Sequence, residues 1–101
     1  MNQKFTQSEI SLEAFRAGDD MVFEQVKEIY HLTFFDFANQ LIQNADVATD
    51  IVNDTFEKLK RKRNNFDTLS NIKCFMYITV RNSCLDYLRM MNMVFKMQQN
   101  N

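Results

Sequence analysis

The chain has 101 residues, of which 46% are hydrophobic and 25% charged, and its formal net charge at pH 7 is -1. This length suits one domain with a single core that needs no disulfide or metal to hold it together. Pro is absent and Gly18 is the only glycine, so the turn signals of a β protein are missing and the fold is predicted to be all-α. No apolar run approaches the roughly 20 residues of a membrane span, and the N-terminus lacks the features of a signal peptide. We therefore expect a soluble, cytoplasmic protein with no membrane partner.

Charge is distributed unevenly along the chain. Residues 1–57 carry three basic and eleven acidic side chains, a net charge of -8, whereas residues 58–101 carry nine basic and two acidic ones, a net charge of +7. Such asymmetry favours a protein whose two surfaces meet partners of opposite charge. The alternative is a helical domain whose oppositely charged ends pack against each other.

The sequence offers little to a metal ion, a cofactor or a catalytic reaction. Cys74 and Cys84 are ten residues apart in one predicted helix, which separates them by about 15 Å and excludes a disulfide between them. There is no Cys-x-x-Cys motif, and His31 is the only histidine, so no metal site is expected. Because no nucleophile–base set or phosphate-binding loop is present either, we expect neither a cofactor nor enzymatic activity.

The first half of the chain predicts a short helix over residues 10–17 and a long one that runs to about residue 43. Residues 1–7 are polar and expected to be frayed. Gly18 stands where the end of a helix favours a left-handed residue. The candidate N-caps are Ser8 or Thr6 for the first helix and Asp19 or Asp20 for the second.

The second half predicts a third helix from Asp46, as N-cap, to about residue 63, and a fourth that continues past Arg89 before it loses definition. Ser70 or Asn71 is the expected N-cap of the fourth helix. Residues 97–101 are expected to be disordered. The prediction is therefore a single domain over residues 1–101, with one short N-terminal helix and three longer packed helices.

The third predicted helix is strongly amphipathic. Its apolar face, the predicted core, consists of Ala48, Ile51, Val52, Thr55, Phe56 and Leu59. The opposite face is a polar and mostly acidic strip formed by Asp50, Asn53, Asp54 and Glu57. On its own this acidic strip is typical of a solvated helix face.

The fourth predicted helix carries a basic and aromatic stripe. Lys73, Tyr77 and Arg81 recur every four residues and so lie on one side of the helix, and Arg89 is displaced by about 80° from Arg81. A packed helix that presents cations and an aromatic ring is suited to bind nucleic acid. A loop over residues 64–70, with Phe66 as its aromatic residue, leads into this helix.

Together these stretches resemble the second conserved region of bacterial sigma factors. The similarity covers about residues 19–89. Residues 46–59 are similar to the polymerase-contacting helix, and they read DVATDIVNDTFEKL. Phe66 and the run Arg-Asn-x-x-Leu-Asp-Tyr-Leu-Arg over residues 81–89 resemble the promoter-reading part of the extracytoplasmic-function group. Lys60 departs from the family pattern, which commonly has Trp there, and Met-rich sequence follows Arg89 where the family usually has more basic residues.

The resemblance implies a sigma-factor domain that binds core RNA polymerase and reads the minus-ten element. The acidic strip would dock on the clamp helices of the β′-type subunit. The non-template single strand of promoter DNA would lie against a set of loop and helix residues: Phe66, Asp67, Thr68, Leu69, Ser70, Asn71, Lys73, Tyr77, Arg81, Asn82 and Arg89. The alternative is a sigma-like interaction module that binds polymerase or an anti-sigma factor without reading a promoter. A helix-turn-helix module for the minus-thirty-five element is not found in this chain.

Overall fold

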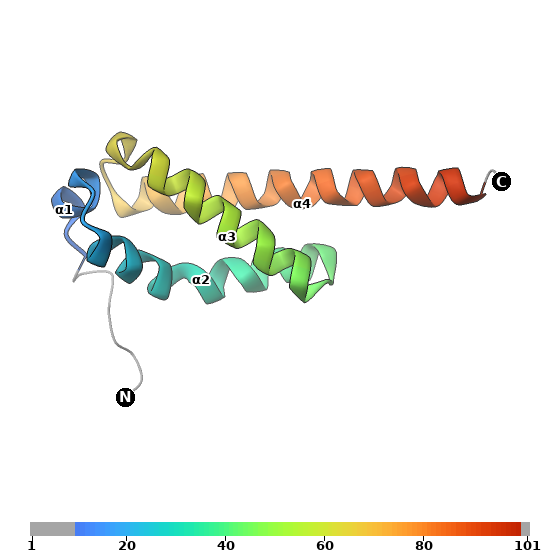
Figure 1. The fold of residues 1–101 in the computed structure, drawn as a ribbon, viewed down its shortest axis with the longest axis horizontal. Helices are drawn as coiled ribbons and strands as arrows, with labels where there is room; N and C mark the ends of the chain where they lie inside the picture. Colours follow the sequence, from blue (N-terminus) through green and yellow to red (C-terminus); the bar gives the residue numbers. More distant parts are fainter. Residues whose placement is uncertain (1–9, 100–101) are drawn as a thin grey trace, which may run out of the picture.

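The computed structural model describes residues 10–99, which form four α helices and one 3-10 turn and contain no strand. Helices α2, α3 and α4 pack side by side, α1 lies across one end, and the second half of α4 projects from the other end (Figure 1). The predicted all-α, four-helix architecture is confirmed. In chain order the elements are α1 (Leu12–Ala17), α2 (Asp20–Ile42), α3 (Ala45–Arg61), η2 (Arg63–Asn65) and α4 (Leu69–Gln99).

Local capping sets the first helix boundaries. Gly18 adopts φ 96° and ends α1, and the Asp19 carboxylate accepts hydrogen bonds from the backbone N–H groups of Met21 and Val22 at 2.9 and 3.3 Å, which starts α2. Both features were predicted. The N-cap of α1, however, is Ser11, whereas the predicted caps Ser8 and Thr6 lie outside the described residues.

The later boundaries differ from the predicted ones. Helix α3 begins two residues early because the Asn44 side chain, rather than that of Asp46, accepts from a backbone N–H of the first turn, at 3.1 Å. It ends at Arg61, and the next residues form the η2 turn. Helix α4 begins at Leu69, where the Thr68 hydroxyl accepts from the N–H of Asn71 at 3.0 Å, so neither Ser70 nor Asn71 is the cap.

Helix α4 also runs further than predicted. Instead of losing definition after Arg89 it continues to Gln99, so the predicted disorder over 97–101 is wrong for residues 97–99, and residues 100–101 lie outside the described part. The physical reason is the amino-acid composition, which favours a helix. Residues 90–99 contain no Gly or Pro, and they include four Met and two Gln residues, which are good helix formers. At 31 residues α4 is about 46 Å long, against about 26 Å for the 17-residue α3, so the body cannot cover it along its whole length.

The core is filled by the apolar face of α3 and the facing sides of α2 and α4. Phe56 is 1% exposed and packs edge-on against Phe23 of α2 at 6.5 Å between ring centroids. The predicted core residues of α3 are buried except Ile51, which is partly buried against the core cluster. Helix α4 contributes a seam, a row of buried residues spaced four apart: Ile72, Met76, Val80 and Cys84.

Helix α1 packs on the turn that leads into α4. The Arg63 guanidinium lies over Gly18, where an added Cβ would approach its Nη2 atom to 2.8 Å, and its Nη1 donates to the backbone carbonyl of Lys60 at 2.8 Å. Arg16 of α1 forms an ion pair with Asp67 at 3.4 Å. Helix α1 and Gly18 therefore hold the loop that precedes α4.

Candidate nucleic-acid and polymerase interface

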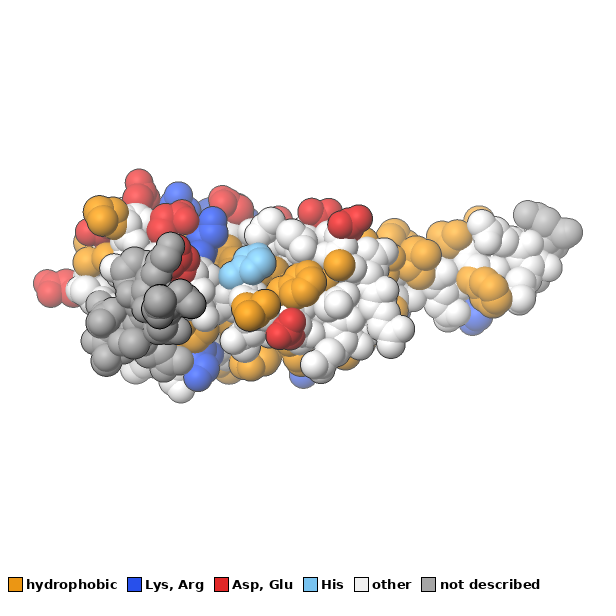
Figure 2. Space-filling model, turned by 90° about the horizontal axis from the view of Figure 1, so that it is seen from below, with side chains coloured by type: hydrophobic (Ala, Val, Ile, Leu, Met, Phe, Trp, Pro, Cys, Tyr) orange, Lys and Arg blue, Asp and Glu red, His pale blue; other side chains and the backbone are white. Residues whose placement is uncertain are grey.

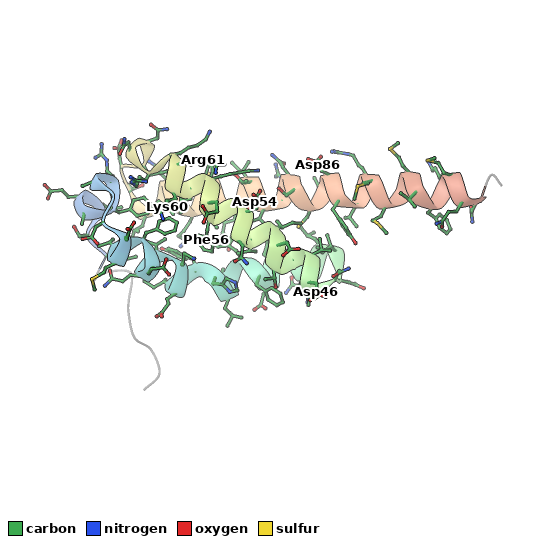
Figure 3. All side chains as sticks on the ribbon, in the orientation of Figure 1. Asp46, Asp54, Phe56, Lys60, Arg61 and Asp86 are labelled. Atoms are coloured by element: carbon green, nitrogen blue, oxygen red, sulfur yellow. The ribbon has the colours of Figure 1, made fainter. Side chains whose placement is uncertain are left out.

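The acidic strip of α3 is fully presented to solvent. Asp50, Asn53, Asp54 and Glu57 are all exposed. Asp54 forms the only ion pair of the strip within residues 10–99, with Lys58 at 3.4 Å, four residues further along the helix. Figure 3 shows Asp54 on α3 with Phe56 turned toward α2. The strip thus offers a carboxylate surface on a helix whose other side is fixed by the core.

The predicted loop over residues 66–71, whose last three residues form the first turn of α4, contains both buried and exposed side chains. Phe66, which was predicted to contact DNA, is 8% exposed and packs edge-on against Phe75 at 5.3 Å between ring centroids, so most of its ring lies in the core beneath the loop. Asp67 is exposed but paired with Arg16, and Leu69 is partly buried. Thr68, whose hydroxyl caps α4, is exposed, as are Ser70 and Asn71 in the first turn of that helix.

The basic and aromatic stripe of α4 lies at the edge of its contact with α2. Tyr77 is 39% exposed, and its ring packs edge-on against Phe34 at 4.7 Å and Phe37 at 5.1 Å. Lys73 is half-buried one turn before it, and Arg81 is exposed one turn after it. Tyr77 is therefore a packing residue that keeps part of its ring accessible.

Two further predicted residues lie toward the outside of α4. Arg81 donates a long hydrogen bond of 3.5 Å to the side-chain oxygen of Asn82, which is exposed. Arg89 is exposed and pairs with Asp86 at 2.8 Å. The structure thus brings the loop, Lys73, Tyr77 and Arg81 together along one side of α4, whereas Asn82 and Arg89 lie on a neighbouring face.

Sequence reasoning missed the role of Lys60. Its ammonium lies 5.4 Å from the centroid of the Phe23 ring and 3.9 Å from a carboxylate oxygen of Asp20, so the long side chain covers α2 through a cation–π contact. No local signal reveals this contact, because Phe23 belongs to another helix. Arg61 lies nearby at the same end of α3 (Figure 3).

The cations at the end of α3 also lie close to the loop in space. Arg61 and Lys62 are exposed, and η2 joins them directly to the loop and α4 (Figure 1). The η2 turn thus leads from two exposed cations at the end of α3 to the loop before α4.

The sequence model for sigma-70 region 2 matches residues 28–92, which is 65 of the 101 residues. The chain belongs to the sigma-70 region 2 family. The match spans most of α2, all of α3, the loop and α4 as far as residue 92, so every predicted site residue lies inside it. Neither the comparison with curated proteins nor the comparison with solved structures gave a match.

Sigma-70 region 2 is a sigma-factor region involved in RNA polymerase binding and promoter melting, and the family is not a class of enzymes. In the described part of this sigma region, no group of three His, Cys, Asp or Glu side chains could hold a metal ion. None of the helices over residues 10–99 combines the length and the apolar character that crossing a membrane requires.

Proposed function

We propose that this sigma region 2 domain, of the extracytoplasmic-function type, docks on the β′-type clamp helices of core RNA polymerase through the acidic strip and holds the non-template single strand of the minus-ten element along α4. It would act in the cytoplasm, where the polymerase works. The observation that carries the proposal is the separation of the two surfaces: one exposed face of α3 is lined by the acidic strip, and the cations gather at the end of α3 and on α4. Each surface lies inside the family match.

The acidic strip suits a protein partner with basic side chains. Asp50 and Glu57 form no ion pair within residues 10–99, so their charges are available without breaking an internal contact. The buried face of α3, with Val52 and Phe56, keeps the helix from rotating when the strip is bound. Complementary charge of this kind speeds association and fixes orientation.

The loop and α4 suit a melted strand more than a duplex. Single strands are held by cations along the backbone and by aromatic rings on which bases stack. The exposed part of Tyr77 offers such a ring beside Lys73 and Arg81. Since Phe66 is buried, it supports the loop from below, and the exposed side chains of Thr68, Ser70 and Asn71 are left to contact a base. Strand opening would be driven by this binding free energy.

The experiment combines the two partners. The chain is first co-purified with core RNA polymerase, and a fluorescent minus-ten single strand is then titrated onto the complex at several salt concentrations. If two to four phosphates are contacted, the logarithm of the affinity should fall with the logarithm of the salt concentration with a slope of about -1.4 to -2.8. A scrambled single strand and a duplex of the same sequence serve as controls, and equal affinity for all three would contradict promoter reading.

A second candidate is an interaction module that binds polymerase or an anti-sigma factor without reading DNA. Two observations favour it: Tyr77 is engaged by Phe34 and Phe37, and Arg89 is engaged by Asp86. Polymerase binding without sequence-selective strand binding in the titration above would support this candidate.

A further inference from the structure

Helix α1 contacts the segment before α4 through two arginines, one from α1 and one from η2. Arg16 of α1 places its Nη1 atom 3.4 Å from Oδ1 of Asp67, in the loop over residues 66–71. Arg63 of η2 packs its guanidinium over Gly18, at the end of α1. An open hollow of about 410 Å³, lined by residues of α1 and η2, lies beside these contacts. The junction is thus partly open, and the arginine side chains bridge it.

Within this loop, Asp67 depends on α1 for its only polar side-chain contact. The residue before it, Phe66, is anchored by its ring against Phe75, and the residue after it, Thr68, accepts a hydrogen bond from a backbone N–H of α4. The Asp67 carboxylate forms no other ion pair and no side-chain hydrogen bond within residues 10–99. Its orientation between two anchored neighbours is therefore set by Arg16.

The contact also removes a negative charge from the basic half of the chain. Asp67 and Asp86 are the two acidic residues between positions 58 and 101. Asp86 is paired with Arg89 of its own helix at 2.8 Å, whereas the arginine that pairs with Asp67 comes from α1. An unpaired carboxylate in the loop would repel the phosphates of a strand that lies along α4. Both carboxylates of this half are instead balanced by an arginine.

We propose that Arg16 is a positioning residue for base selection: it holds the Asp67 carboxylate, and thereby fixes the part of the loop that leads to Thr68 and to the exposed side chains of Ser70 and Asn71. The inference rests on the proposed binding of a single strand and deepens it. It adds α1 to the site, because α1 lies outside the residues 28–92 that match the family model.

The expected effect is on selectivity and not on the fold. The side chains of Arg16 and Asp67 are 47% and 73% exposed, and exposed ion pairs contribute little to stability. Removal of Arg16 should therefore leave the helices intact. A loop that is held less firmly should distinguish the minus-ten strand from a scrambled strand about three- to fivefold less well, which is the range that an exposed ion pair can supply.

Three variants separate position from charge. Arg16→Gln removes the ion pair, Arg16→Lys keeps a cation for Asp67, and Lys62→Gln removes an exposed cation that forms no ion pair within residues 10–99. Both strands are titrated onto each polymerase-bound chain. Arg16→Gln should lower the ratio of the two affinities about three- to fivefold, and Arg16→Lys should keep it within about twofold. Lys62→Gln should weaken both strands alike, because phosphate contacts carry no sequence information.

Amide hydrogen exchange in the free chain gives a second readout that involves no DNA. The N–H groups of Asn71 and Ile72 bond to the hydroxyl and the carbonyl oxygen of Thr68 at 3.0 and 3.3 Å. Arg16→Gln should speed their exchange by at least about threefold, and Arg16→Lys should leave it within about twofold.

Unchanged exchange in Arg16→Gln, or an unchanged affinity ratio in a chain that does prefer the minus-ten strand, would overturn the inference. Faster exchange in Arg16→Gln, combined with no strand preference in the unchanged chain, would contradict the proposed function, while the positioning of the loop by Arg16 would stand.

Discussion

The two halves of α4 present the same chemistry to different surroundings. Up to Cys84 the apolar residues that recur every four positions along α4 are buried by α2 and α3, whereas most apolar residues from Leu85 onward are exposed (Figure 2). The difference arises from length, since α4 has 31 residues and α3 has 17. Burial of an apolar side chain is therefore decided by what reaches it: apolar residues of α4 stabilise the fold where α2 and α3 cover them and stay exposed beyond that cover.

The largest expected effect is on stability, and it concerns a core residue of α3, the helix that covers the first half of α4. Phe56→Ala removes a ring that is 1% exposed and contacts Phe23, so it should lower the free energy of unfolding by about 3–5 kcal/mol. Thermal melting followed by circular dichroism at 222 nm measures this loss. A stability close to that of the unchanged protein would mean that α3 does not cover the core through this face.

The comparison between the two halves of α4 is tested by replacing one Met with Ala in each half. Met76→Ala, in the buried seam, should cost about 2–5 kcal/mol of unfolding free energy. Met91→Ala, in the exposed end of α4, should cost less than about 0.5 kcal/mol. Urea unfolding of both variants gives the two values. Equal losses of unfolding free energy would contradict the conclusion that the end of α4 is exposed.

A smaller effect is expected at the end of the body that holds the loop. Gly18→Ala forces a side chain into φ 96° and places its Cβ 2.8 Å from the Arg63 guanidinium, which would have to move. The left-handed backbone alone should cost about 1–2 kcal/mol. The matched control is Ala17→Ser, which alters the neighbouring exposed residue inside α1. A cost for Gly18→Ala as small as for the control would mean that α1 does not require this turn.

The smallest effect concerns affinity for DNA. Arg81→Gln removes one exposed cation from α4 and should flatten the salt dependence of single-strand binding by about 0.7 for every sequence. Substitutions at Ser70 and Asn71 should instead change base preference and leave the slope unaltered. The titration on the polymerase-bound chain measures both quantities, and an unchanged slope for Arg81→Gln would remove this residue from the strand path.

Features that depend on neighbouring residues in the sequence were predictable. The left-handed Gly18, the Asp19 cap and the amphipathic faces of α3 follow from local rules and were confirmed. The choice between Asn44 and Asp46 as cap was not, because both side chains suit the role and only the observed hydrogen bond to Val47 distinguishes them.

Features that depend on another helix were harder to predict. Phe66 was predicted as a loop residue that contacts DNA, but the burial of its ring against Phe75 depends on how the loop folds over α4. The place of Tyr77 on α4 was predicted, but its packing against Phe34 and Phe37 requires knowledge of how α2 lies beside α4. The length of α4 was underestimated, because the helix was expected to lose definition after Arg89 although the residues there are good helix formers.

The most direct test of the central claim is co-purification of core RNA polymerase with charge-reversed variants. Asp50→Lys with Asp54→Lys reverses the acidic strip, and Glu28→Lys with Asp36→Lys makes the same charge change at exposed positions of α2. All four residues are exposed, so both double variants should keep the helicity of the unchanged chain. The account predicts that the α3 variant loses the polymerase and that the α2 variant retains it; retention by the α3 variant, or equal loss by both, would contradict it.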